Sequence, residues 1–411
     1  MLNTTYSKSI LLVLGLLLLA GCAVQPPGAP APASPQPTET FLPATATATV
    51  IPPTPTFEPP TPTPSPLPSF QTAMYRGGLD HRGVYEVAVP PRSGELIWQF
   101  TTGGEVHSSP TLAGGVLYFG SDDSHVYALD AATGTERWRF DMPGATFSSP
   151  AVADGVVYVG TATGFFAIDA RTGTELWRFD TGFGGRMRSS PAVAGGLVFA
   201  GSDNGYLYAL DAATGQERWS FKTLGEVLSS PAVVQDTVYV GSGDHSLYAL
   251  DATTGQERWR FKTGERVFAS PTLADGVVYF GGLDRHVYAL DAGTGEVMWQ
   301  AELPDRVVSS AAVASGVLYV GSLDWQVYAL DVENGAEMWH FKAENEVYGS
   351  PSLAGGVLYV GSDDGRLYAL DAATGEPIWH YETGGFIGSS PAIGSGAVYF
   401  GSYDGSVYAV R

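Results

Sequence analysis

Few residues of this 411-residue chain have the types and spacing that chemistry requires. The seven histidines are scattered and form no close pair of the kind that binds zinc. His340 and His380 stand at equivalent places in two repeats, where we expect an exposed outer edge. Ser-Ser-Pro steps recur in most repeats, which favours a structural role over a nucleophile. Asp363-Asp364 has the composition of a turn and lacks the spacing of a calcium loop. The sequence therefore predicts no metal site and no catalytic residue.

A second set of candidates occupies positions at which otherwise similar repeats differ. It combines arginine with aromatic side chains, a mixture that is common at protein interfaces. The arginines gather basic charge on a body that is otherwise acidic. We expect a binding face for a peptide segment or an acidic ligand; the alternative is variation without function at exposed positions and at a channel mouth. The candidates are Arg186, Arg188, Arg266, Arg306, His107, Phe147, Phe268, Tyr348 and Trp325.

The lone cysteine, Cys22, follows an apolar run at residues 10–19. That run is too short for a membrane-spanning helix and has the length of a signal-peptide core. The sequence LAGC, which ends at Cys22, resembles the lipobox of bacterial lipoproteins. The resemblance implies a signal peptide at residues 1–21 and lipid attachment to Cys22; the alternative is an ordinary signal peptide with an incidental cysteine. With one cysteine, an internal disulfide is impossible.

Residues 22–70 are rich in proline, threonine, alanine and serine. This composition cannot bury a core and predicts a disordered stalk that would hold the rest of the chain away from its membrane. Only Lys8, Glu39 and Glu58 are charged before residue 71, so the remainder carries nearly all of the net charge of −21. An acidic body repels phosphate backbones, which excludes nucleic acid as an expected partner. We expect a lipid-anchored protein of the cell membrane or outer membrane that faces the periplasm or the cell exterior.

Tryptophan recurs at intervals of 39–42 residues, which indicates one structural unit repeated and packed against itself. Each unit reads as four short strands joined by tight turns, the pattern of a β-propeller blade. Counting units predicts an all-β, eight-bladed propeller of four-stranded antiparallel blades over residues 71–411. The last unit lacks its fourth strand, and a spare strand at residues 94–100 should complete it and close the ring. We expect this propeller to be monomeric. The recurring residues are Trp98, Trp138, Trp177, Trp219, Trp259, Trp299, Trp339 and Trp379.

The turns of such blades lie on two faces. In a four-stranded blade the first and third turns share one face, while the second turn and the connections between blades share the other. The repeats of this chain differ mainly on the second of these faces. Because the first strand of a blade is innermost, we expect the varying residues ahead of the Ser-Ser-Pro steps to border a central channel.

The motif Ala-x-Asp-x-x-Thr-Gly-x-x-x-Trp, which begins at Ala128, recurs along residues 93–411 and resembles the tryptophan-docking motif of the PQQ-like (pyrroloquinoline quinone-type) propeller family. In that family the tryptophan packs between neighbouring blades, a role that suits a large flat side chain. The resemblance implies the same role for the eight recurring tryptophans. The aspartate of the motif, Asp130 in the first unit, should accept bonds from the backbone amides of the following turn.

The family includes PQQ-dependent alcohol dehydrogenases, which carry an adjacent-cysteine disulfide against the cofactor and calcium ligands on insertions between blades. This chain has no cysteine after Cys22 and no long insertion. We therefore expect no cofactor, and no PQQ in particular, and no enzymatic activity. The chain also resembles the propeller lipoproteins of the outer-membrane protein assembly machinery, which implies a scaffold that binds another envelope protein or a peptide. Two alternatives stay open: a PQQ-dependent quinoprotein dehydrogenase, and a surface module that binds carbohydrate through exposed rings such as Trp325 and Tyr403.

Overall fold

A computed structural model describes residues 73–87, 90–182 and 185–411 of the chain. Of the two units into which the chain divides, Met1–Thr63 and Pro64–Arg411, only the second contains described residues. The predicted signal peptide, the lipid-bearing Cys22 and the stalk at residues 22–70 lie outside the described residues. In the described part, no helix has the length and apolar character that crossing a membrane requires.

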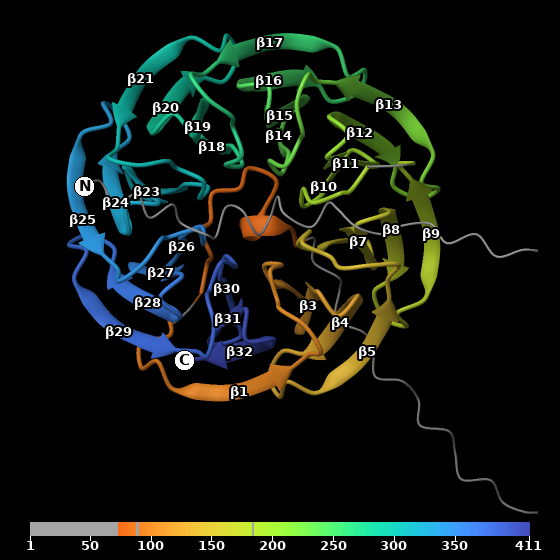
Figure 1. The fold of residues 1–411 in the computed structure, drawn as a ribbon, viewed down its shortest axis with the longest axis horizontal. Helices are drawn as coiled ribbons and strands as arrows, with labels where there is room; N and C mark the ends of the chain where they lie inside the picture. The colour runs from red at the N-terminus through yellow and green to blue at the C-terminus, as the bar shows by residue number, and fades with distance from the viewer. Residues whose placement is uncertain (1–72, 88–89, 183–184) are drawn as a thin grey trace, which may run out of the picture. The chain divides into compact units, whose positions relative to one another are not determined.

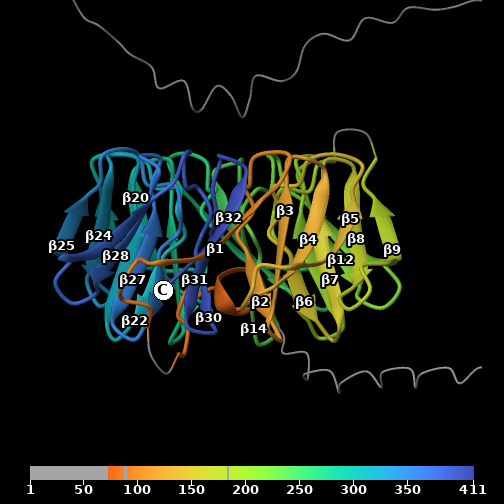
Figure 2. The same ribbon diagram turned by 90° about the horizontal axis from the view of Figure 1, so that it is seen from below.

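The described residues of the second unit form eight four-stranded antiparallel sheets, which follow one another around a central axis (Figure 1). This confirms the predicted eight-bladed propeller. Seen from the side, the strands run between the two faces that carry the turns (Figure 2). In each blade the four strands follow one another from the channel to the rim.

The strand bounds, from the channel outward, are as follows. Blade 1 is β2 (Thr111–Ala113), β3 (Val116–Ser121), β4 (His125–Asp130) and β5 (Glu136–Asp141). Blade 2 is β6 (Ala151–Ala153), β7 (Val156–Gly160), β8 (Gly164–Asp169) and β9 (Glu175–Asp180). Blade 3 is β10 (Ala192–Ala194), β11 (Leu197–Gly201), β12 (Tyr206–Asp211) and β13 (Glu217–Lys222). Blade 4 is β14 (Ala232–Val234), β15 (Thr237–Ser242), β16 (Ser246–Asp251) and β17 (Glu257–Lys262).

Blade 5 is β18 (Thr272–Ala274), β19 (Val277–Gly281), β20 (His286–Asp291) and β21 (Val297–Glu302). Blade 6 is β22 (Ala312–Ala314), β23 (Val317–Gly321), β24 (Gln326–Asp331) and β25 (Glu337–Lys342). Blade 7 is β26 (Ser352–Ala354), β27 (Val357–Gly361), β28 (Arg366–Asp371) and β29 (Pro377–Glu382). Blade 8 is β30 (Ala392–Gly394), β31 (Ala397–Gly401), β32 (Ser406–Val410) and β1 (Leu96–Thr101).

The core lies between neighbouring blades. The second and third strands of a blade are buried along most of their length, because both of their faces pack against other sheets. The outermost strand alternates, as in β17, where exposed residues follow half-buried ones. His340 and His380 lie exposed on two such outer strands, β25 and β29, as the sequence predicts.

The ring closes through strands from the two ends of the propeller sequence. Strand β1 pairs antiparallel with β32, with Trp98 opposite Ala409 and Gln99 opposite Tyr408. An ion pair of 2.8 Å between Arg411 and Glu95 adds to this seam. The pairing is the closure predicted from the spare strand, and it completes blade 8 without leaving a long open sheet edge.

Seven of the eight recurring tryptophans contact the third turn of the next blade. The Trp98 indole donates from Nε1 to the carbonyl oxygen of Ala131 at 2.9 Å. Gly134 has φ of 71°, and a Cβ there would come within 2.6 Å of the Trp98 ring, so only glycine fits this turn. Asp130 accepts from the amides of Ala132 and Thr133 at 3.2 and 3.1 Å. The other indole-to-carbonyl bonds join Trp138 to Ala170, Trp177 to Ala212, Trp219 to Ala252, Trp259 to Ala292, Trp299 to Val332 and Trp339 to Ala372.

Trp379 differs, because it faces blade 8, in which β1 from the start of the propeller pairs with β32 from its end. Its ring lies against Gly94, which takes the place of the turn glycine. The buried Nε1 atom of Trp379 has no acceptor among the described residues. The hydroxyl of Tyr359 donates to the Pro91 carbonyl at 2.5 Å, where the equivalent tyrosines, such as Tyr118, reach the carbonyl that follows a turn aspartate.

The segment before the first blade crosses the channel, a path that the sequence does not predict. Residues 73–87, which include the 3-10 helix η1 (Tyr75–Gly77), lie near the centre of the ring (Figure 1). This segment, called the lead-in below, exchanges backbone hydrogen bonds with the innermost strands of five blades. The bonds, of 2.7–3.0 Å, involve Val152, Val233, Leu273, Val313 and Leu353.

The lead-in contains two buried basic residues, Arg76 and His81. Arg76 donates to the Pro351 carbonyl at 2.8 Å, and its Nε and Nη1 atoms have no partner among the described residues. His81 is 1% exposed, and its Nδ1 lies 3.2 Å from the Pro271 carbonyl. Burial, with a contribution from Arg76, lowers the pKa of His81 to about 3, so this histidine is neutral in the folded protein.

Candidate binding site at the channel mouth

The face opposite the lead-in bonds holds a cup-shaped cavity of about 190 Å³. Each blade contributes one wall residue, which stands two places before the recurring serine that precedes the first strand. The sequence analysis placed this position beside the channel. We call this set the mouth ring. It consists of His107, Phe147, Arg188, Leu228, Phe268, Val308, Tyr348 and Gly388.

The floor of the cavity is a belt of serine side chains, joined by Tyr75 from the lead-in. The amide of Ser109 donates to Oγ of Ser149 at 2.9 Å, and the same bond of 2.9–3.0 Å links seven neighbouring pairs within the described residues. Between Ser350 and Ser390, the Tyr75 hydroxyl lies 3.3 and 3.5 Å from the two Oγ atoms. These serines hold neighbouring blades together at the axis, which explains why they recur.

The two kinds of connection on this face are bonded to each other. The carboxylate of Asp244, in the second turn of blade 4, accepts from the amide of Leu224 in the connection that enters the blade, at 2.9 Å. Gly103 and Asp123 form the same contact in blade 1 at 2.7 Å. The variable turns and variable connections therefore make one continuous face, as predicted.

The predicted binding residues divide into two groups. His107, Phe147, Arg188, Phe268 and Tyr348 line the cavity together. The other four do not line it. These are Arg186, Arg266, Arg306 and Trp325.

The region of the four arginines is less basic than the sequence suggested. Nε of Arg188 donates to both carboxylate oxygens of Asp203 at 3.0 and 3.1 Å. Arg266 contacts Glu226 at 3.0 Å, and Arg306 contacts its neighbour Asp305 at 3.2 Å. Arg186 is exposed and forms no ion pair within the described part of the chain. Most of the expected positive charge is therefore neutralised locally, which argues against an acidic ligand in this part of the mouth.

Blades 7 and 1 instead contribute acidic groups that the sequence analysis did not select, and three of them lie near Tyr403 of blade 8: Glu105, Asp122 and Asp363, with Glu346 beside Asp363. Burial, together with Glu346 and Asp364, raises the pKa of Asp363 to about 7. Asp363 lies in the second turn of blade 7, as the sequence suggests, and it is 5% exposed, a burial that the sequence did not predict. Asp364 does act as a turn residue, since it accepts from the Arg366 amide and the Tyr368 hydroxyl at 2.9 and 2.7 Å.

Tyr403 lies among these acids, and its half-buried ring packs against His107. Its ring centroid is 4.0 Å from that of His107, and burial and the nearby Asp363 raise its pKa. A Cβ at Gly388 would lie 2.6 Å from the Tyr403 hydroxyl, so glycine makes room for this ring. The packing of this ring could have been predicted from the sequence, because the mouth ring has a glycine, Gly388, where the following turn has a tyrosine.

Two family models match the chain. The model of the β-propeller of beta-alanine-activating enzyme matches residues 156–355, and that of outer membrane protein assembly factor BamB matches residues 84–220. Among curated protein sequences, none gives a significant match to this chain.

Solved structures share the fold at low identity. BamB from Moraxella catarrhalis has a TM-score of 0.68 at 20% identity, covering 76% of this chain and 98% of that chain. Quinohemoprotein alcohol dehydrogenase from Comamonas testosteroni has a TM-score of 0.73 at 18% identity, covering 82% and 79%. The computationally designed Ika8 protein has a TM-score of 0.70 at 18% identity, covering 78% and 100%. The relatives thus include an assembly factor, an enzyme and a designed protein, so their likeness concerns the fold. The two family models and the recurring docking motif support a β-propeller similar to those of the PQQ-like repeat family.

Proposed function

We propose that this chain is a non-enzymatic, lipid-anchored scaffold of the cell envelope that binds another protein through the face around the channel mouth. The match to the BamB family model supports a role in binding or assembly. The LAGC sequence at Cys22 supports the lipid anchor. The observation that carries the proposal is the conformation of Trp325.

Trp325 occupies a backbone position that suits glycine. Its φ is 77°, in the left-handed region, which costs an L-residue about 1 kcal/mol or more. At the same turn position blades 3, 7 and 8 have glycine with φ of 80–83°, whereas blades 1, 4 and 5 have Ser124, His245 and Arg285 with φ of 69–72°. The Trp325 side chain is 42% exposed, so packing does not explain the residue. Trp325 differs from these turn residues in its large aromatic ring, and an exposed tryptophan at a strained turn position is the kind of residue that protein interfaces use.

Other large apolar side chains are exposed on the same face. Leu224 is 93% exposed in the connection that enters blade 4. Phe147 and Phe386 are exposed in the connections that enter blades 2 and 8. Together with Trp325, they would give a partner several apolar anchors around a polar cup, the arrangement that favours a protein ligand.

PQQ fits the cavity poorly. The cofactor is a rigid tricyclic molecule with three carboxylates, and the cavity of about 190 Å³ is smaller than the ~300 Å³ at the low end of small-molecule sites. Arg188 is the one permanently cationic side chain among the lining residues, and it is already paired with Asp203. The lone cysteine, Cys22, excludes an adjacent-cysteine disulfide. We therefore derive no quinone chemistry for this chain.

The proposal is tested by capturing partners from the native cells with the full-length chain. Trp325→Gly removes the side chain and relieves the backbone, so the fold should persist while a captured envelope protein is lost or bound at least tenfold more weakly. Arg285→Gly is the matched control, because Arg285 has φ of 72° at the equivalent position of blade 5. Capture that is unaffected by Trp325→Gly, or reduced equally by Arg285→Gly, would contradict the site. PQQ-dependent dye reduction by the purified chain would contradict the non-enzymatic role.

The anchor has its own test. We expect the wild-type chain to incorporate a labelled fatty acid in cells and to sediment with membranes. Cys22→Ser should abolish the label and release the chain from the membrane fraction. Unchanged labelling of the Cys22→Ser variant would contradict attachment at this residue.

A further inference from the structure

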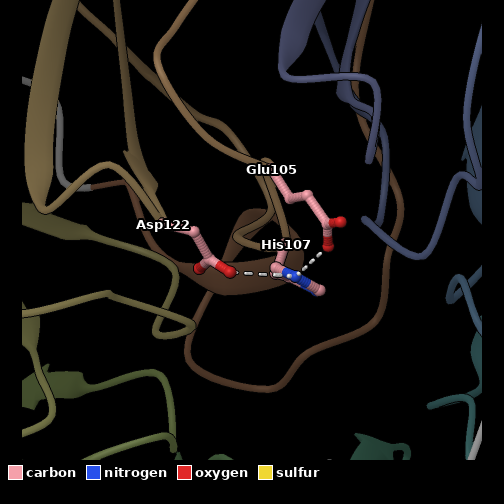
Figure 3. Close-up of side chains that lie close together, drawn as sticks. All are labelled: Glu105, His107 and Asp122. Atoms are coloured by element: carbon pink, nitrogen blue, oxygen red, sulfur yellow. Dashed lines mark hydrogen bonds and ion pairs between the residues drawn. The ribbon is translucent and has the colours of Figure 1, made fainter. Parts of the chain in front are cut away.

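From the mouth of blade 1, we infer a binding site for one divalent transition-metal ion of the zinc class, formed by Glu105, His107 and Asp122. The site is independent of the proposed partner. Glu105 and His107 stand two residues apart in the connection that enters blade 1, and Asp122 follows β3. The Asp122 amide donates to the Glu105 carbonyl at 2.9 Å, which holds the two segments together. All three side chains converge on one point (Figure 3).

The spacing of the donor atoms suits a metal ion. Nε2 of His107 lies 3.0 Å from Oε2 of Glu105 and 3.3 Å from Oδ2 of Asp122. The three atoms all lie within 4.8 Å of one another. An ion with bonds of about 2.0–2.2 Å to neighbouring ligands holds those ligand atoms about 3.0–3.5 Å apart. The two separations that involve His107 therefore already match those that coordination requires, and the two carboxylate oxygens lie within 4.8 Å of each other.

The hydrogen bonding of His107 is unusual in a way that an ion would resolve. Both carboxylates approach the same ring nitrogen, which has at most one proton to share. His125 in the same blade shows the ordinary arrangement, with Nδ1 on Asp123 at 3.1 Å and Nε2 on Asp141 at 2.9 Å. In addition, the buried Oδ1 atom of Asp122 has no hydrogen-bond partner among the described residues.

The surroundings hold the imidazole in place and leave a path for the ion. The rings of Tyr403 and Phe147 lie 4.0 and 4.9 Å from the His107 ring by their centroids. Glu105 is exposed, so the ion would enter from solvent. One imidazole and two carboxylates suit zinc and its neighbours, whereas calcium prefers six to eight oxygen ligands. Three protein ligands leave at least one position for water.

The experiment is a calorimetric titration of the purified, EDTA-treated full-length chain with Zn²⁺. We expect one saturable site, and we expect His107→Ala and Glu105→Gln each to weaken it at least tenfold. Glu105 is exposed, so its amide variant keeps the fold intact. His125→Ala is the matched control and should bind zinc as the wild type does. Co²⁺ should give a visible absorption band that requires His107.

Three outcomes would overturn the inference. The first is no saturable zinc binding by the wild-type chain. The second is an equal loss of affinity in His125→Ala, which would assign the ion to scattered histidines. The third is calcium binding as tight as zinc binding. It would show that the acidic groups of blades 7 and 1 attract any divalent cation without a specific site.

Discussion

The two ends of the central channel are built from the same repeats and differ in what covers them. At one end the lead-in bonds to the innermost strands of five blades and buries Arg76 and His81. At the other end the mouth ring opens onto a face with exposed Trp325 and Leu224. A segment of the chain itself covers much of the first end, which is why we propose the second end as the one that binds a partner.

The covered end is not fully sealed. The lead-in bonds to blades 2, 4, 5, 6 and 7, and a cavity of about 700 Å³ lies beside it against blades 1 and 8. Leu112, Ile393 and Tyr85 contribute to its lining. The two ends therefore differ in their bonding: backbone hydrogen bonds from the lead-in hold the first end, and the mouth is held by the serine belt and by bonds between its turns and connections.

The largest expected effect concerns the wall that both ends share. Trp219→Ala should lower the free energy of unfolding by about 3–5 kcal/mol, because the ring and its bond to the Ala252 carbonyl are lost. Chemical denaturation measures this. Trp379→Ala is the matched control and should cost about 1 kcal/mol less, since its Nε1 has no acceptor among the described residues. A midpoint that is unchanged by Trp219→Ala would rule out the docking role.

The lead-in end should make the protein sensitive to acid. The pKa of His81 is about 3 when folded, against about 6.5 when unfolded, so between these values the unfolded state binds more protons. Stability should therefore fall as the pH falls through this window, by about 2–3 kcal/mol from pH 7 to pH 4.5. Denaturation across this range would show a smaller loss for His81→Gln than for the wild type. Parallel pH profiles for the two proteins would contradict the buried, neutral histidine.

At the mouth, Asp363 should make the stability of the protein depend on pH with the opposite sign. Because the pKa of Asp363 is about 7 when folded and lies near 3.8 when unfolded, the folded state binds more protons between these values. Stability should fall as the pH rises through that window, and Asp363→Asn should stabilise the protein by about 2 kcal/mol at pH 8. Asp364→Asn, the neighbouring control, should destabilise the protein at every pH, because it weakens the contact with Tyr368. Destabilisation of Asp363→Asn at pH 8 would be evidence against the raised pKa.

The smallest effect concerns the strain at the mouth. Trp325→Gly should raise the free energy of unfolding by about 0.5–1 kcal/mol, because glycine adopts positive φ without a steric penalty. Thermal melting of the variant beside the wild type measures the change. A clear loss of stability would show that the Trp325 side chain stabilises the fold through packing. That result would contradict the binding role proposed for Trp325.

The period of the tryptophans was enough to predict the blades, the ring closure through β1 and the mouth ring. Each of these follows from a packing contact that repeats, so it leaves a repeating pattern. The path of the lead-in leaves none, because its contacts are backbone bonds to residues such as Val233 and Leu273, whose side chains obey the ordinary blade pattern.

The chemistry of the mouth was harder to predict, because it depends on contacts between side chains of different turns and connections. Asp203 neutralises Arg188 from the following turn, which reverses the expectation of a basic patch. Tyr403 covers His107 because Gly388 leaves space for it. Neither relation has a fixed spacing that recurs from blade to blade, so comparing repeats shows where the sequence varies and not how the varied residues combine.

The central claim, that a partner binds the mouth face, is tested most directly by site-specific photocrosslinking in the native cells. One probe replaces Trp325, and the other replaces Ser315, an exposed residue of the same blade in the first turn, which lies on the opposite face. We predict a crosslinked envelope protein from position 325 and none from position 315. A crosslink from position 315 alone would contradict the account and would assign binding to the lead-in end.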